Sequence, residues 1–172
     1  CYITVKNSNG THWRQKPDAL NLSGYRLPTD DEWEIACRAG TRTSRSFGND
    51  PAWIDRYAVC NNSEANLLSV ASRKPNSLGL FDMLGNVSEW IHTDMENAED
   101  EKGLRRIRGG SAWTSLSDVR SAARYVYPSR ERSPKIGFRV ARTIILDSDQ
   151  HAEPGHILSA VEFEVGPPAC TP

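Results

Sequence analysis

The sequence predicts an α+β fold with little regular secondary structure. One segment, residues 29–40, carries a complete set of helix signals, whereas the other ordered segments have the patterns of short strands. Residues 41–78 are punctuated by Ser, Asn, Gly and Pro, which is typical of loops. The length of 172 residues fits one domain with a hydrophobic core of its own.

The N-terminal segment predicts a hairpin followed by a helix. Residues 2–5 form the first expected strand, Asn9-Gly10 the tight turn, and residues 11–13 the return strand. Thr29 is the expected N-cap of the helix, because Glu32 follows three residues later and completes a capping box, and Gly40 is expected to mark the helix end. Helical spacing gives its buried stripe as Trp33, Ala36 and Cys37.

The remaining segments predict loops and late strands. Within residues 41–78 we expect the pair Trp53 and Ile54 and the pair Tyr57 and Val59 to anchor the loop. The organisation that we expect is one domain at residues 1–146, followed at 147–172 by a linker, an extra strand and a Pro-rich end. The last strand of the domain is expected to continue through residues 143–146. In residues 161–165 apolar and polar side chains alternate, which is typical of a half-buried strand. That strand is either an added edge strand of the domain or the start of a neighbouring unit.

Composition is that of an ordinary soluble globular protein, with 38% hydrophobic and 25% charged residues. The formal net charge of −1 gives no electrostatic reason to expect nucleic acid as a partner, and no apolar run reaches the ~20 residues that span a membrane. Basic residues concentrate between Arg105 and Arg142, but they are spread among Gly, Ser and aromatic residues, which favours a role in bracing loops. Acidic residues in 94–103 indicate a solvated loop. Because Cys1 is not a natural translation start, we expect a mature form or an excerpt of a longer chain, and the sequence selects no compartment.

The most informative stretch is residues 79–90, where Asp82 and Glu89 bracket a turn at Gly85. A carboxylate among apolar residues needs a partner, since an isolated buried charge is costly. Calcium would serve, with side-chain oxygens from Asp82 and Glu89 and main-chain oxygens from Gly85 and Val87. The alternative is an ordinary turn in which Asp82 accepts from backbone amides and Glu89 pairs with an arginine. Spacing alone favours this alternative.

Three further motifs accompany this stretch, at residues 25–34, 108–111 and 136–142. Together the four resemble those of the formylglycine-generating-enzyme (sulfatase-modifying factor) family, in the same order and over residues 24–142. The resemblance implies a variant of the C-type-lectin fold, an α+β domain with little regular structure. It also implies a structural calcium ion at the equivalents of Asp82, Gly85, Val87 and Glu89.

The same resemblance argues against catalysis. The family's oxidative reaction needs a cysteine pair just beyond the Arg-Gly-Gly-Ser motif, where soft thiolates hold copper. Residues 111–119 contain no cysteine, and Ser88 stands where the enzymes place a tryptophan. Ser111 matches an active-site serine of the family but cannot carry the reaction alone. We therefore expect no catalytic residues, no copper and no enzymatic activity.

The four cysteines are at positions 1, 37, 60 and 170. In the family, the cysteine that matches Cys37 pairs with a position that is Ser121 here, so that bridge is absent and Cys37 is expected to be a small buried side chain. Cys1 and Cys170 remain candidates for a terminal clasp.

The function that the sequence favours is a catalytically inactive, lectin-like binding or scaffold domain within a larger bacterial protein or complex. A protein partner is expected, because Tyr, Trp and Arg are enriched at protein interfaces. The resemblance assigns the binding face to Trp113, Arg120, Arg124, Tyr125 and Tyr127. A bracing role in the fold is the alternative for Trp113 and the arginines.

Two other functions stay open. One is a ligand-binding protein diversified by a retroelement, with variable positions at 112–118 and 125–135. The other is an oxygenase-like or sulfatase-maturation enzyme, a metal- and oxygen-dependent oxidoreductase whose metal site is completed elsewhere. Its iron-dependent branch uses three histidines from a further helical domain, whereas the four histidines here are scattered.

Overall fold

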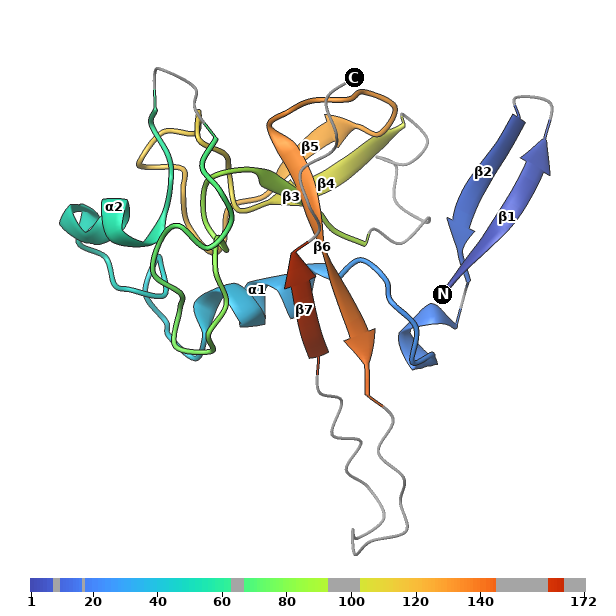
Figure 1. Cartoon of the computed structure of the whole chain (residues 1–172), viewed down its shortest axis with the longest axis horizontal. Helices are drawn as coiled ribbons and strands as arrows, with labels where there is room; N and C mark the ends of the chain where they lie inside the picture. The colour runs from blue at the N-terminus through green and yellow to red at the C-terminus, as the bar shows by residue number, and fades with distance from the viewer. Residues whose placement is uncertain (8–9, 17, 63–66, 93–102, 145–160, 166–172) are drawn as a thin grey trace, which may run out of the picture.

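The computed structural model describes residues 1–7, 10–16, 18–62, 67–92, 103–144 and 161–165. Within these ranges it contains a two-stranded hairpin, a five-stranded mixed sheet and a nine-residue helix, connected by long loops. Figure 1 shows the loops gathered on one side of the sheet and the hairpin on the other. The predicted α+β class is therefore confirmed.

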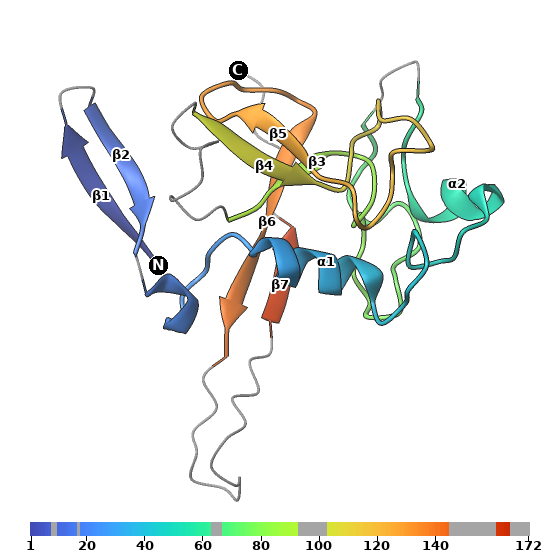
Figure 2. The same cartoon turned by 180° about the vertical axis from the view of Figure 1, so that it is seen from behind.

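The hairpin consists of β1 (Tyr2–Asn7) and β2 (Gly10–Gln15), paired antiparallel with Tyr2 opposite Gln15. Both strands extend further than the sequence predicted. Figures 1 and 2 show the hairpin beside the N-terminus and set apart from the larger sheet. The Tyr2 hydroxyl accepts a hydrogen bond from the Leu27 amide at 3.2 Å, which connects the hairpin base to the segment that leads into the helix.

Helix α1 (Asp30–Arg38) begins at the predicted capping box. The Thr29 hydroxyl accepts from the Glu32 amide at 3.2 Å, and the Glu32 carboxylate accepts from the Thr29 amide at 2.8 Å. The helix ends before Gly40, because Ala39 already adopts a left-handed conformation with φ 49°. The predicted stripe of Trp33, Ala36 and Cys37 is buried.

The other helical segments are short turns: η1 (Ala19–Asn21), η2 (Pro51–Trp53) and α2 (Ile54–Tyr57). Ile54 anchors its loop in the core, but Trp53 is 44% exposed, so the prediction for Trp53 is wrong. Its ring lies under the Arg56 guanidinium instead, while Tyr57 stacks on Phe47 with ring centroids 4.6 Å apart. In the described part of the chain, no helix is long and apolar enough to cross a membrane.

The larger sheet has the strand order β5-β4-β3-β6-β7. Neighbouring strands are antiparallel except β3 and β6, which run parallel with Glu89 opposite Gly137. Figure 2 shows α1 in front of β6 and β7, so the helix covers one face of this sheet. The strands are β3 (Ser88–Trp90), β4 (Leu104–Arg108), β5 (Tyr125–Pro128), β6 (Ile136–Thr143) and β7 (Val161–Val165).

The late strand joins this sheet as its outer strand. β7 pairs antiparallel with β6, with Val161 opposite Thr143. Of the two alternatives for residues 161–165, an added edge strand therefore describes the structure. The expected strand at 143–146 ends at Thr143, and residues 145–146 lie outside the described ranges, as do the linker, the Pro-rich end and residues 94–102. The boundary at residue 146 stays a prediction.

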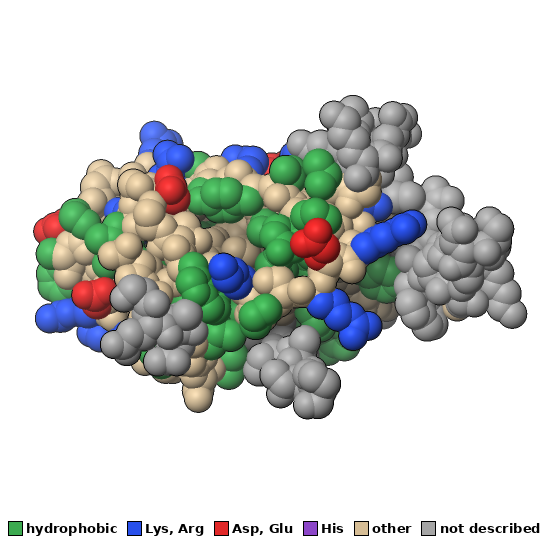
Figure 3. All heavy atoms as spheres, turned by 90° about the horizontal axis from the view of Figure 1, so that it is seen from above, with side chains coloured by type: hydrophobic (Ala, Val, Ile, Leu, Met, Phe, Trp, Pro, Cys, Tyr) green, Lys and Arg blue, Asp and Glu red, His purple; other side chains and the backbone are tan. Residues whose placement is uncertain are grey.

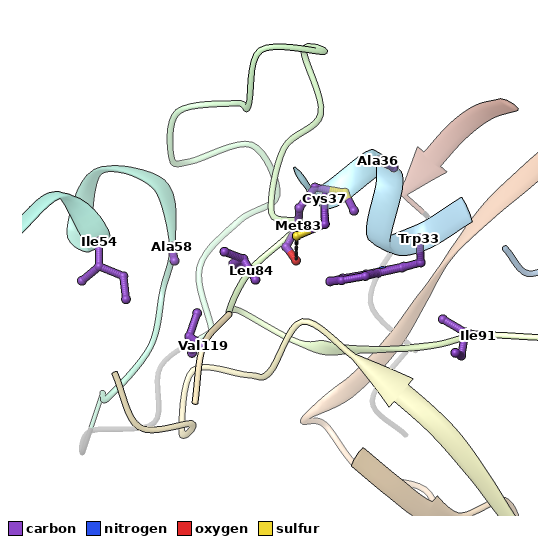
Figure 4. Packing of buried hydrophobic residues seen from close by; sticks show 9 residues of the cluster. All are labelled: Trp33, Ala36, Cys37, Ile54, Ala58, Met83, Leu84, Ile91 and Val119. Atoms are coloured by element: carbon purple, nitrogen blue, oxygen red, sulfur yellow. Dashed lines mark hydrogen bonds between the residues drawn. The ribbon is translucent and has the colours of Figure 1, made fainter. Parts of the chain in front are cut away.

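The core lies between α1, β3 and the loops (Figure 4). Trp33 is fully buried, and a Cβ atom at Gly109 would lie 3.2 Å from its ring, so this glycine lets the backbone approach the indole. Met83 and Leu84 face Cys37 from the turn before β3. The core residues are Trp33, Ala36, Cys37, Ile54, Ala58, Met83, Leu84, Ile91 and Val119.

Candidate functional site

The turn at residues 82–89 packs tightly against a neighbouring loop. Gly85 has φ +78°, and a Cβ atom there would lie 2.3 Å from the Val59 carbonyl oxygen, so only glycine fits. The Asn86 amide donates to that same carbonyl at 2.8 Å. These contacts fix the turn that precedes β3 and thereby orient Asp82 and Glu89.

Glu89 is held by an arginine and a tryptophan. Its exposed fraction is 3%, and its two carboxylate oxygens accept from Nε and a terminal nitrogen of Arg139, each at 2.6 Å. One of these oxygens also accepts from the Trp33 indole N–H at 2.7 Å. Burial alone would lower the pKa of Arg139, but the Glu89 carboxylate outweighs burial and raises it, so the guanidinium stays charged.

Asp82 is also buried, and it accepts from the Ala71 amide at 2.7 Å. Its φ of +53° is uncommon outside glycine, and Asp tolerates it better than most residues. The carboxylate lines a small pocket beside Lys74, next to the stacked rings of Phe47 and Tyr57. Its negative charge contributes to the raised pKa of Arg139, which places both carboxylates in the field of one guanidinium.

These contacts bear on the predicted calcium site. Two carboxylates and two main-chain carbonyls are the oxygen ligands that calcium accepts, so the residue types fit. However, Glu89 already has a guanidinium as counter-charge, and Asp82 has an amide donor. The burial of the two carboxylates therefore gives no independent argument for a metal ion. Among the described residues, no group of three or more His, Cys, Asp or Glu side chains is placed to hold a metal. Calcium at Asp82, Gly85, Val87 and Glu89 stays a prediction.

The loop after the Arg-Gly-Gly-Ser motif is built from hydroxyl groups and main-chain bonds. The Thr114 hydroxyl accepts from the Ser111 amide at 2.8 Å, and the Ser111 carbonyl accepts from the Thr114 amide at 2.9 Å. The Ala112 amide donates to the Asn86 carbonyl at 2.8 Å, which docks this loop on the turn before β3. The loop thus has a fixed conformation but contains no thiol.

Cys37 and Ser121 are neighbours, as the family resemblance implies for this pair of positions. The Cys37 sulfur donates to the Ser121 hydroxyl at 3.4 Å, and both residues are fully buried. Burial raises the pKa of the Cys37 thiol to about 12, so the thiol is protonated and unreactive. Cys1, Cys37 and Cys60 form no disulfide with one another. Cys170 lies outside the described residues, so the disulfide between Cys1 and Cys170 stays a prediction.

The predicted binding residues near this loop differ in their contacts. The Trp113 ring is half-buried and lies 4.9 Å from the Lys135 ammonium, a cation–π contact. Arg120 is exposed, and its side chain has no partner among the described residues. Tyr127 is half-buried and meets the Trp90 ring edge-on, with centroids 6.3 Å apart.

Arg124 and Tyr125 are tied to the domain itself. Arg124 forms ion pairs with Asp30 and Glu34 of α1 at 2.7 and 2.9 Å, although its side chain is 43% exposed. The Tyr125 hydroxyl donates to the Asp118 carbonyl at 3.0 Å. Burial raises the pKa of Tyr125, and the Asp118 carboxylate adds to the shift, while Arg120 acts in the opposite direction. A bracing role is therefore visible for Arg124.

Two buried arginines hold the loops together: Arg108 lies in the segment where the sequence predicted bracing arginines, whereas Arg45 was not predicted. Arg108 is fully buried, pairs with Asp30 at 2.9 Å and Glu34 at 2.5 Å, and donates to two main-chain carbonyls. Arg45 donates to the Val119 and Leu116 carbonyls at 2.8 and 2.6 Å. An arginine can satisfy several loop carbonyls at once because it carries five N–H groups. Arg108 lies in a motif, whereas no local pattern marks Arg45.

Known proteins resemble this chain over most of its length. The serine/threonine-protein kinase pkn1 of Chlamydia pneumoniae is 32% identical over 149 residues, which cover 78% of this chain and 24% of the kinase. A formylglycine-generating enzyme of Streptomyces coelicolor is 30% identical, covering 82% and 54%. An inactive C-alpha-formylglycine-generating enzyme 2 of Bos taurus is also 30% identical, covering 69% and 44%. This chain spans about a quarter to a half of these relatives.

A solved structure and a family model agree with these sequence matches. The structure of Treponema denticola variable protein 1 superposes with a TM-score of 0.63 at 32% identity, covering 72% of this chain and 49% of the other. The model of the sulfatase-modifying factor enzyme 1-like domain matches residues 6–144. The chain therefore belongs to the sulfatase-modifying factor (formylglycine-generating enzyme) family and has its fold.

Proposed function

We propose that this domain is a catalytically silent binding or scaffold domain of its family, within a larger bacterial protein or complex. The observation that carries the proposal is the loop at residues 111–119. By the family resemblance, this loop corresponds to the segment in which the oxidative chemistry needs two thiolates, and it contains hydroxyl groups and main-chain bonds instead. Hydroxyl groups do not hold copper(I) as thiolates do.

The relatives support this proposal. A family member from Bos taurus is named inactive, and the kinase relative carries the matching segment as about a quarter of its length. The family therefore contains members without the oxidative activity, and members in which the matching segment is one part of a longer chain. A domain kept without catalysis suits the role of a binding module.

The binding face that we propose follows from the contacts of the predicted residues. Arg124 is engaged with α1 and the Tyr125 hydroxyl with Asp118, so these two residues shape the face. Trp113, Arg120 and Tyr127 are the members that a partner would contact most directly, since each presents ring or guanidinium surface to solvent. Aromatic and arginine side chains carry much of the energy of protein interfaces.

Replacing Trp113 with Leu tests the binding face. The matched control is Trp53→Leu, because Trp53 also lies under a cation and is partly exposed, but belongs to another segment, η2. Immobilised wild type, the Trp113 variant and the control would capture proteins from lysate of the source organism, with quantification by mass spectrometry. We expect the Trp113 change to weaken retention of the partner roughly 30-fold, the effect of removing about 2 kcal/mol at a hot spot.

The control should retain the partner as wild type does. A partner that is lost equally from both variants, or from neither, would contradict the proposed face. Thermal melting of each variant separates loss of binding from loss of the fold.

We also propose that a structural calcium ion binds at Asp82, Gly85, Val87 and Glu89, supported by the family resemblance and by the oxygen types. A ligand that binds only the folded state stabilises it by RT ln(1 + [L]/Kd), about 2.7 kcal/mol at 100 times Kd. The melting temperature should therefore be higher in calcium than in chelator. Asp82→Asn should abolish this difference, because it removes the negative charge that attracts the ion. The fold should be kept, since Asn tolerates the positive φ and can still accept a hydrogen bond from the Ala71 amide. Identical melting of the wild type in calcium and in chelator would contradict the calcium site and leave Arg139 and Trp33 as the partners of Glu89.

A variable ligand-binding domain is the second candidate function. The observation that favours it is the resemblance to Treponema denticola variable protein 1. In this chain, residues 115–118 and 129–132 lie exposed within the two segments expected to vary. Sequencing the encoding locus tests this candidate, because a diversified gene should have an imperfect second copy of these segments nearby. A locus without such a copy would exclude it.

A further inference from the structure

Positive charge is concentrated in residues 105–142, about a fifth of the chain. Residues 105–142 contain ten Lys or Arg residues and two acidic residues, whereas the rest of the sequence contains eleven basic and twenty acidic residues. The near-neutral net charge of the whole protein therefore conceals a strong local excess. A partner that approaches this segment meets that local charge, because salt screens charges beyond about 8–10 Å.

Some of this charge is used inside the fold. Arg108, Arg124 and Arg139 form ion pairs with carboxylates of α1 or β3, and Arg108 and Arg139 are buried. The Lys135 ammonium lies over the Trp113 ring. None of these cations is available to a partner without breaking a contact.

Three arginines are different. Arg120, Arg130 and Arg132 are exposed, and none of them has an ion pair or a side-chain hydrogen bond with another described residue. One acidic residue, Glu131, lies between the last two and is also exposed. On the face seen from above, Figure 3 shows Lys and Arg side chains among hydrophobic side chains and a few Asp or Glu side chains. These three arginines can therefore bind an external carboxylate without breaking an ion pair or a hydrogen bond to another described residue.

The three arginines flank an open strand edge. Arg120 precedes β5, Arg130 and Arg132 follow it, and β5 is an outer strand of the sheet. The Ser129 amide donates to the Gly103 carbonyl, so hydrogen-bonded pairs alternate along this ladder and the main-chain groups of Val126 face away from β4. Four residues of strand span about 13 Å, so an extended segment lying along β5 reaches arginines at both ends.

The edge itself offers little for main-chain pairing. Val126 presents one amide and one carbonyl, and the next outward position is Pro128, which has no N–H. A proline on an edge strand limits the addition of a further strand. Binding at this edge therefore depends on side chains, and the side chains that flank it are the three arginines.

We propose that the surface formed by Arg120, Arg130 and Arg132 along β5 binds an acidic, extended segment of a partner protein. The proposal rests on the proposed binding function and adds the chemistry of the partner. Arginine suits this role because its planar guanidinium holds carboxylates in bidentate pairs.

A fluorescence-anisotropy titration with purified protein tests the proposal. The probe is a labelled decapeptide of glutamate, and a glutamine decapeptide and a ten-nucleotide single-stranded DNA serve as comparisons. The test variant is Arg120→Glu/Arg130→Glu/Arg132→Glu. The matched control, Lys16→Glu/Arg42→Glu/Arg56→Glu, makes the same change in net charge at exposed positions outside residues 105–142.

We expect wild type to bind the glutamate peptide, more weakly as salt rises, and to ignore the glutamine peptide. The test variant should lose at least roughly tenfold in affinity, and the control should stay within about twofold. Equal losses in the two variants would overturn the proposal, because attraction would then depend on net charge alone. Tighter binding of the DNA than of the peptide would overturn the protein partner. Because the titration needs no native partner, its outcome is independent of the Trp113 experiment.

Discussion

Replacing Glu89 with Gln probes the contact on which the centre of the fold depends. The exposed fractions of Glu89 and Arg139 are 3% and 1%, and the carboxylate accepts three hydrogen bonds of 2.6 to 2.7 Å. Glutamine keeps the shape but removes the charge, which leaves a buried guanidinium without its counter-ion. Breaking a buried pair in this way costs about 3–5 kcal/mol.

Urea unfolding followed by tryptophan fluorescence measures this loss. With a slope of about 2 kcal/mol per molar urea, the midpoint should fall by about 1.5–2.5 M. Glu131→Gln is the matched control, since the same chemical change at an exposed position should alter the free energy of unfolding by less than about 0.5 kcal/mol.

A second variant keeps the test informative if Glu89→Gln does not fold. Trp33→Phe removes the indole N–H that donates to Glu89, which should cost about 1.5–3 kcal/mol, the range for a hydrogen bond to a charged group, and the smaller ring leaves a cavity in the core that adds to this loss. A Glu89 variant with the stability of wild type would refute the reasoning, because the carboxylate would then not be the counter-charge of Arg139.

Two further predictions concern titration. Burial alone would raise the pKa values of Glu32 and Glu34, but hydrogen bonds from Arg26 and from Arg108 outweigh it and lower both below about 4.5. The contribution of these two carboxylates to stability is therefore complete above about pH 4.5 and is lost as pH falls through the lowered pKa values. The urea midpoint should drop steeply below about pH 4.5, and a flat midpoint down to about pH 3 would contradict this. Burial raises the pKa of the Cys37 thiol to about 12, so iodoacetamide at about pH 8 should modify Cys37 far more slowly in the native protein than in urea. Peptide mass mapping would measure the two rates, and equal rates would contradict the burial of Cys37.

Local signals in the sequence were sufficient for the elements whose cause is local. The capping box at Thr29 and Glu32 and the apolar stripe with Trp33 determine α1, and the two strands predicted for the hairpin pair antiparallel. The helix end was placed too late because Ala39 adopts the left-handed conformation that glycine usually supplies.

The contacts between loops could not be derived in the same way. Glu89 and Arg139 are 50 residues apart, and Arg45 and Val119 are 74 apart, so no pattern within a window links them. The arginine alternative for Glu89 was stated from spacing, but which arginine fills the role depends on the parallel pairing of β3 with β6. For the candidate binding face, the residue types were readable, whereas the division into bracing Arg124 and unpaired Arg120 needed the tertiary structure.

The most direct test of the central claim is an assay for formylglycine. Purified protein would be incubated with copper, oxygen, a reductant and a cysteine-containing sulfatase peptide, and the aldehyde product would be measured by mass spectrometry. The formylglycine-generating enzyme of Streptomyces coelicolor, a relative at 30% identity, is the positive control. Because residues 111–119 offer no thiolate to copper, the account predicts no more product than a protein-free blank contains. Peptide turnover clearly above that blank would contradict the assignment as a catalytically silent domain.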